Sequence, residues 1–330
     1  LLHPKARDKI KPDEIKRLSE LGISIFTGAK ELGVELKNHY PSNVDMIGLC
    51  YEPYSPEVGE DGSYSERIEA AVESLIKLKT EHGLSVLSLL IPTEMVPTTA
   101  TKSILSQCKK AGIWLIGPNS PGMSRSSPDA HPSHLKVAQI PMQCILPGEV
   151  AVAGVGGTML FETLADLKRN GVGTSWAISL GGDRTRGLSG RDAALIAEND
   201  PNTKYIVYIG EPGGFAAQEL AEVMNAGLIT KPLIVKILGS RLPDDCHIGH
   251  AGAVVRGADF ERTQIKIDSL KSAGAIVVHT SEQMVQIISY LRENLQFGPI
   301  NIHSPQFMTA RQVMGNLIQA QESVISGITG

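Results

Sequence analysis

Cysteines, aromatic residues and long apolar runs are all scarce in this sequence. Of its 330 residues, 5% are aromatic and four are cysteines, none of them in a Cys-x-x-Cys pair: Cys50, Cys108, Cys144 and Cys246. Thiols so far apart favour reduced, mostly buried side chains over a disulfide framework. No apolar run approaches the roughly 18 residues of a membrane-spanning helix, and no secretory signal is visible. We therefore expect a globular protein that is not inserted into a membrane.

An excess of positive charge is also missing. The chain has 31 basic and 35 acidic residues, for a formal net charge of −4. This balance gives no electrostatic reason to expect nucleic acid or an anionic membrane as a partner. Two motifs of other enzyme classes are lacking as well: no Gly-x-Ser-x-Gly elbow follows a strand, and Met159 stands where a dinucleotide-binding Gly-x-Gly-x-x-Gly would place its last glycine.

Apolar segments with strand character alternate along the chain with segments of helical spacing. Strands are expected at 23–26, 45–50, 84–91, 113–116, 150–153, 174–180, 205–209, 232–238 and 275–279, with helices between them. This alternation predicts an α/β fold with parallel sheets, and 33 glycines suit its tight strand-to-helix turns. The length predicts two domains, since a domain usually has roughly 100–200 residues.

The long polar stretch 123–147 separates the two alternating series. We place the domain boundary near Pro147-Gly148, which gives a first domain at 1–147 and a second at 148–296. Residues 297–330 form a C-terminal tail, expected to be partly helical from 310 to 324.

Three segments of the second domain have the composition of a phosphate-handling site. The first is Ala153-Gly154-Val155-Gly156-Gly157-Thr158, between a strand and a helix. Small residues let backbone N–H groups approach a phosphate, and the helix dipole favours the anion. A simple tight turn explains the glycines equally well.

The second segment is Gly210-Glu211-Pro212-Gly213-Gly214, which follows an apolar strand. A carboxylate at Glu211 could accept a hydrogen bond from an imidazole and fix its tautomer. An acid near a helix start is also common without any function.

The third segment is Ile248-Gly249-His250-Ala251-Gly252-Ala253. Its small neighbours leave room around the His250 ring, and a neutral imidazole nitrogen is a good nucleophile towards phosphorus. Cys246 and His247 lie close by and suggest a metal, but structural zinc requires four ligands in spaced pairs. We therefore predict no metal site.

The segment Gly249-His250-Ala251-Gly252-Ala253 resembles the phosphohistidine motif of succinyl-CoA synthetase α subunits, which is shared by ATP-citrate lyase and citryl-CoA synthetase. Four further segments resemble motifs of this superfamily of NDP-forming acyl-CoA synthetases and follow its order. They are Thr93-Glu94-Met95-Val96-Pro97, Gly117-Pro118-Asn119-Ser120-Pro121-Gly122, Gly181-Gly182-Asp183 and Ile209-Gly210-Glu211-Pro212-Gly213-Gly214.

The resemblance implies a Rossmann-like CoA-binding-type domain followed by a flavodoxin-like ligase domain. It implies that the catalytic pair is His250, which is transiently phosphorylated, and Glu211, which holds the imidazole. Gly156, Gly157 and Thr158 would bind the phosphoryl group, and the CoA-binding residues would be Thr93, Glu94 and Asn119. Nucleoside triphosphate and Mg²⁺ would belong to a partner, an ATP-grasp β subunit, which agrees with the lack of a Walker-type loop here.

Some positions depart from the family pattern. Ile25 and Glu31 stand where its first phosphate loop has glycines, and Tyr51-Glu52-Pro53-Tyr54 replaces the run Thr-Pro-Gly-Lys-Gly-Gly. The alternative is thus a diverged paralogue, with reduced or no activity, that serves as a structural subunit of a larger complex. The family's habit, with the missing initiator Met, leads us to expect the mitochondrial matrix and the tricarboxylic acid cycle, or otherwise the cytoplasm.

Overall fold

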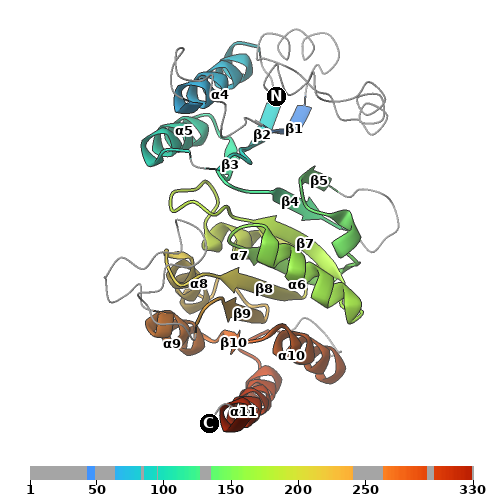
Figure 1. The fold of residues 1–330 in the computed structure, drawn as a ribbon. Coiled ribbons are helices and arrows are strands. Elements are labelled where there is room, and N and C mark those ends of the chain that lie inside the picture. The colour runs from blue at the N-terminus through green and yellow to red at the C-terminus, as the bar shows by residue number, and fades with distance from the viewer. Residues whose placement is uncertain are drawn as a thin grey trace. The chain divides into compact units, whose positions relative to one another are not determined.

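The computed structural model describes residues 43–48, 64–82, 85–94, 96–126, 135–240, 263–295 and 301–328. They form two compact units, each with its own sheet (Figure 1). The first unit contains the chain up to Gly122 together with Gly181–Leu188, and the second contains Met123–Leu180 and the chain from Ser189 onward.

The first unit contains a parallel three-stranded sheet. Its order is β1 (Asn43–Gly48), β2 (Ser85–Leu90) and β3 (Trp114–Ile116). Helices α4 (Tyr64–His82) and α5 (Thr98–Lys110) alternate with these strands and pack against each other. The buried residues Ile68, Val72 and Leu75 recur at helical spacing on α4 and share one core with Leu89 and Ile104.

The second unit contains a seven-stranded sheet of order β10-β9-β8-β6-β7-β4-β5. Strands β6, β7, β8, β9 and β10 are parallel to one another and lie in the order 7-6-8-9-10. This is the flavodoxin-like order 2-1-3-4-5. The strands are β4 (Gly122–Arg125), β5 (Leu135–Ala138), β6 (Pro147–Gly154), β7 (Thr174–Ser179), β8 (Tyr205–Gly210), β9 (Leu233–Ile237) and β10 (Ile276–Val278).

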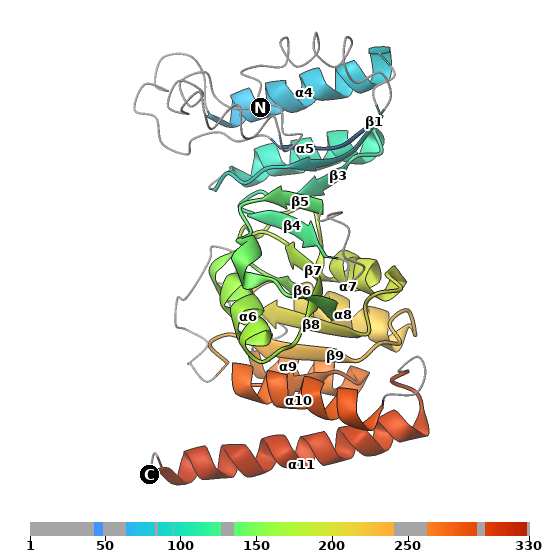
Figure 2. The same cartoon turned by 90° about the vertical axis from the view of Figure 1, so that its right-hand side faces the viewer.

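Helices cover both faces of this sheet (Figure 2). On one face α6 (Thr158–Arg169) packs beside α10 (Ser281–Asn294); on the other, α7 (Gly190–Asn199), α8 (Ala216–Asn225) and α9 (Thr263–Ala273) follow one another. Every residue of β8 is buried, as expected for a central strand of a covered parallel sheet. The predicted α/β fold with parallel sheets is therefore confirmed. Among the described helices, none is long and apolar enough to cross a bilayer.

The segment 123–147, expected as a polar connection, instead contains β4, β5 and a short 3-10 helix, η2 (Met142–Cys144). β4 pairs antiparallel with β7 at the side of the second sheet. Ser126, the residue after β4, is hydrogen-bonded to β7: its N donates to Ser175 O at 2.8 Å, and its hydroxyl donates to Thr174 O. The two units consequently divide between Gly122 and Met123, upstream of the expected boundary at Pro147-Gly148.

The C-terminal tail contains helix α11 (Pro305–Ile328), longer at both ends than the expected 310–324. It packs on α10 and β10. Phe307, Ala310 and Met314 form its buried face, whereas Met308 and Leu317 are exposed.

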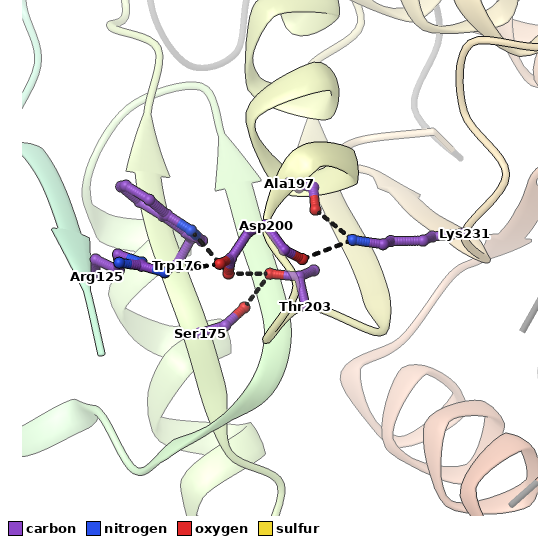
Figure 3. A network of polar contacts seen from close by, with 7 residues as sticks. All are labelled: Arg125, Ser175, Trp176, Ala197, Asp200, Thr203 and Lys231. Atoms are coloured by element: carbon purple, nitrogen blue, oxygen red, sulfur yellow. Dashed lines mark hydrogen bonds and ion pairs between the residues drawn. The ribbon is translucent and has the colours of Figure 1, made fainter. Parts of the chain in front are cut away.

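A buried carboxylate ties β4 to the connection between α7 and β8 (Figure 3). Asp200 accepts hydrogen bonds from Arg125 Nη2 at 2.8 Å, Trp176 Nε1 at 3.1 Å and Thr203 Oγ1 at 2.8 Å. Lys231 Nζ donates to the Asp200 carbonyl oxygen at 2.8 Å. Trp176 lies near the start of β7, and Thr203 precedes β8. The network therefore lies near the amino ends of these strands, away from the edge where such sheets bind ligands.

We expect Asp200→Asn to destabilise the fold at neutral pH and to do so less in acid. Burial alone would raise the pKa of Asp200, but hydrogen bonds from Thr203 and Arg125 and the charge of Arg125 lower it below its ordinary value. A carboxyl group whose pKa is lower in the folded protein than in the unfolded chain stabilises the fold. This stabilisation is complete above the unfolded-state pKa of about 3.9, and it is lost as the pH falls through the folded-state pKa. Urea unfolding should show a loss of about 1–3 kcal/mol at pH 7.

The same comparison at pH 3.5 should give a smaller difference. Asp268→Asn, which changes an exposed acid on α9, is the control. If the free energies of unfolding of wild type and Asp200→Asn differ by the same amount at both pH values, the ionised Asp200 carboxylate is not the source of the stability.

Candidate functional site

The candidate site lies at the carboxyl ends of β6 and β8, where the strand order of the second sheet reverses. From β6 the chain continues to β7 on one side, and β8 lies on the other. Open α/β sheets bind ligands outside the carboxyl ends of their strands at such a switch point. Two of the three predicted segments, 154–158 and 210–214, follow these two strands.

Backbone and side-chain hydrogen bonds hold the 154–158 loop to both neighbouring strands. Val155 N donates to Ile209 O at 3.2 Å, and Leu180 N donates to Gly154 O at 2.9 Å. Ser179 Oγ, at the end of β7, donates to Gly156 O at 3.1 Å. A Cβ at position 154 would lie 3.3 Å from both Cβ and O of Ile209, so glycine permits this close approach.

The loop leads directly into α6. Gly156 has a positive φ of 78°, which favours glycine, and Gly157 is the N-cap. Because Gly157 has no side chain, the N-cap itself adds no side-chain acceptor to the first turn of the helix. Thr158, the first helical residue, is exposed. The backbone N–H groups of this turn and the helix dipole can together receive an anion.

Glu211 is the first residue after β8 and is buried, with 9% of its surface exposed. The strand end before it is fixed to β9, since Leu238 N donates to Gly210 O at 2.9 Å. The loop then passes through Gly214, with φ of 77°, and reaches α8 at Ala216. A buried carboxylate thus follows the strand beside the glycine loop, as a residue that orients an imidazole requires.

Lys266 was missed by the sequence analysis and contacts this loop directly. It lies on α9, is 1% exposed, and its Nζ donates to the carbonyl oxygen of Pro212. The signal in the sequence is its position: Thr263, Lys266, Ile267 and Leu270 recur at helical spacing and are all buried. A lysine on such a stripe is unusual, because buried ammonium groups are costly to desolvate.

The predicted CoA-binding residues lie in the first unit and come together there. Thr93 follows β2 and Asn119 follows β3, and Asn119 N donates to Thr93 O at 2.8 Å. The predicted Gly-Gly-Asp segment joins them: Gly182 N donates to Asn119 O at 2.9 Å, and Asn119 Nδ2 donates to Asp183 Oδ1 at 3.2 Å. Thr93 is buried, whereas Glu94 beside it is exposed. Three motifs far apart in the sequence thus form one polar cluster.

His250 lies outside the described residues, as do Cys246 and His247. The described chain ends after β9 at Ser240 and resumes at Thr263. The pairing of His250 with Glu211 therefore stays a prediction. Within the described segments, no group of three or more His, Cys, Asp or Glu side chains is arranged to hold a metal ion.

Known proteins resemble the chain in sequence over the same region. Residues 154–285 match the family model described as CoA-ligase. The chain is 30% identical over 197 residues to succinate–CoA ligase [ADP-forming] subunit alpha 2 of Archaeoglobus fulgidus, covering 60% of this chain and 66% of that one. It is 31% identical over 200 residues to the corresponding alpha subunit of Methanothermobacter thermautotrophicus, covering 61% and 65%. It thus spans slightly less than two thirds of these relatives.

The fold resembles a solved structure of ATP citrate lyase from Methanothrix soehngenii in complex with citrate and coenzyme A. The TM-score is 0.65 at 22% identity, over 82% of this chain and 42% of that one. This likeness concerns the fold alone. The sequence matches go further: residues 154–285 match the CoA-ligase family model, and about 60% of the chain is similar in sequence to succinate–CoA ligase α subunits.

Proposed function

We propose that this chain is the α-type subunit of an NDP-forming acid–CoA ligase and carries a phosphoryl group on His250. Glu211 accepts a hydrogen bond from the imidazole, and the amides at Gly156, Gly157 and Thr158 receive the negative charge. A ring nitrogen of His250 attacks phosphorus as the acyl-phosphate P–O bond breaks. The phosphoryl group then passes to a nucleoside diphosphate. A covalent phospho-enzyme divides one difficult transfer into two easier ones.

One observation carries the proposal: a glycine loop opening a helix and a buried carboxylate follow adjacent strands at the switch point of a flavodoxin-like sheet. The loop fits a phosphoryl group because glycines bring its backbone amides to the helix start. The carboxylate fits an imidazole partner because one oxygen can fix the tautomer and stabilise the imidazolium.

CoA is the second proposed ligand: in the direction of acyl-CoA formation, its thiol would attack the acyl carbon of the acyl phosphate, and inorganic phosphate would leave. The cluster of Thr93, Asn119 and Asp183 supports this, since it lies at the carboxyl ends of the neighbouring strands β2 and β3. We further propose that nucleotide and Mg²⁺ bind to an ATP-grasp β subunit, which the naming of the relatives as alpha subunits supports. Residence in the mitochondrial matrix and a role in the tricarboxylic acid cycle rest on the family resemblance only.

Labelling tests the proposal. The full chain is incubated with its β partner, Mg²⁺ and ATP or GTP that carries ³²P in the γ position. We expect label on His250 that is labile in acid and stable in base, as a phosphoramidate is. No label from a folded complex would exclude phosphoryl transfer.

A CoA titration of the full chain distinguishes the alternative, in which the chain is a structural subunit of a larger complex. Saturable binding supports the ligase. No binding and no label would together favour the structural role.

A further inference from the structure

Lys266 is placed where packing alone does not require a lysine. Its neighbours on the buried stripe of α9 are Thr263, Ile267 and Leu270. Methionine has a similar length and would fill the same position without the cost of desolvating an ammonium group. Replacing a buried charge by a well-packed apolar residue is often neutral or stabilising. The lysine therefore contributes something other than apolar packing.

A hydrogen bond of its ammonium group points to the site. Lys266 Nζ donates to the carbonyl oxygen of Pro212, which is buried and directly follows Glu211. Proline has no N–H, so this carbonyl is its only backbone hydrogen-bonding group. A hydrogen bond from a charged donor is about twice as strong as a neutral one. It therefore joins α9 to the loop residue whose position determines where the Glu211 carboxylate lies.

The backbone of this loop is also held from its other side. Leu238 N donates to Gly210 O at 2.9 Å, directly before Glu211. Glu211 is thus flanked by two carbonyl groups that different elements hold, with β9 on one side and α9 on the other. After Pro212 the chain passes Gly213 and Gly214, which have the greatest conformational freedom of any residue type. The Lys266 contact therefore holds the loop at a point beyond its strand end.

We infer that Lys266 is a positioning residue: by holding the Pro212 carbonyl it sets the Glu211 carboxylate for phosphoryl transfer. The inference rests on the proposed function for its catalytic consequence but not for its effect on the loop. Lys266 acts through Glu211 and does not itself contact the reacting atoms. Its loss should therefore slow transfer without removing the group that carries the phosphoryl.

The test compares Lys266→Met, Lys266→Arg and the control Lys271→Met in the full chain. Lys271 lies on the same helix and is exposed. Amide hydrogen exchange of loop 211–215 should be about tenfold faster or more in Lys266→Met, as loss of a charge-assisted hydrogen bond implies. It should be unchanged in Lys271→Met and close to wild type in Lys266→Arg. Unchanged exchange in Lys266→Met would overturn the inference.

The labelling rate provides the second readout. With the β partner and nucleoside triphosphate, Lys266→Met should label about 10- to 100-fold more slowly, the usual cost of losing a group that orients a reacting residue. Lys266→Arg should recover most of that rate. A purely structural role would instead lower the thermal midpoint while leaving the labelling rate of the folded protein unchanged, which would also overturn the inference. If wild type takes no label but the exchange result holds, the proposed function fails while Lys266 still positions the loop.

Discussion

Replacing His250 by Asn is expected to abolish phosphoryl labelling of the chain. Asparagine keeps a polar side chain with a hydrogen-bond donor, but its amide nitrogen is not a nucleophile, whereas a neutral imidazole nitrogen is. No other histidine of the sequence has the Gly-His-Ala-Gly-Ala context. The loss should be complete within detection, because this residue forms the covalent bond itself. Label is measured after denaturation, in acid and in base, and located by peptide mapping.

His247→Asn is the matched control for this experiment. His247 is three residues away in the same segment. Its replacement by Asn changes the local composition in the same way and leaves the proposed phosphoryl carrier in place. It should label at nearly the wild-type rate. CoA binding should survive in both variants, because the proposed CoA-binding residues belong to the other unit. Full labelling of His250→Asn would show that another residue carries the phosphoryl group.

Outside the segment 123–147, the order of strands and helices in the described residues could be predicted from sequence with little error. The helix expected at 281–294 is α10, and the strand expected at 205–209 is β8, which ends one residue later. Each has a sequence pattern that its surroundings require: the helix buries one face at helical spacing, and the strand is apolar throughout because it is completely buried. The flavodoxin-like strand order followed from the family resemblance, since periodicity does not reveal which strands are neighbours.

The edge of the second sheet could not be predicted in the same way. β4 contains Ser124 and Arg125, which have no apolar alternation, and its stability comes from partners distant in sequence. Ser126 is satisfied by backbone of residues 174 and 175, and Arg125 by Asp200. Such partners are known only once the pairing of the strands is known. A polar side chain can be buried only where another group accepts or donates its hydrogen bonds.

The candidate site shows the same distinction. Glycines at 154, 156 and 157 and the acid at 211 were visible, since each follows an apolar strand and precedes a helix. Lys266 was not recognised, although it occupies the stripe of Thr263, Ile267 and Leu270. Lysine ordinarily lies on the solvent side of a helix, so its exceptional burial requires a partner, here the Pro212 carbonyl 54 residues earlier.

Glu211→Gln is expected to slow phosphoryl labelling by about 10- to 100-fold, the usual cost of losing a partner that orients a reacting imidazole. Glutamine has the same shape, and its amide oxygen can still accept a hydrogen bond, but the negative charge that stabilises an imidazolium is lost. The amount of label at long times should remain close to wild type, because His250 is intact.

Glu222→Gln on α8 is the control, since Glu222 is exposed. A wild-type rate in Glu211→Gln would show that the carboxylate has no part in transfer and serves the loop only. The double variant with Lys266→Met then decides how the two residues are related. If Lys266 acts by positioning the Glu211 carboxylate, the lysine has little left to position once that charge is removed. The double variant should then lose much less labelling rate than the product of the two single losses. Independent effects, with rate losses that multiply, would mean that Lys266 assists transfer by a route that does not pass through Glu211.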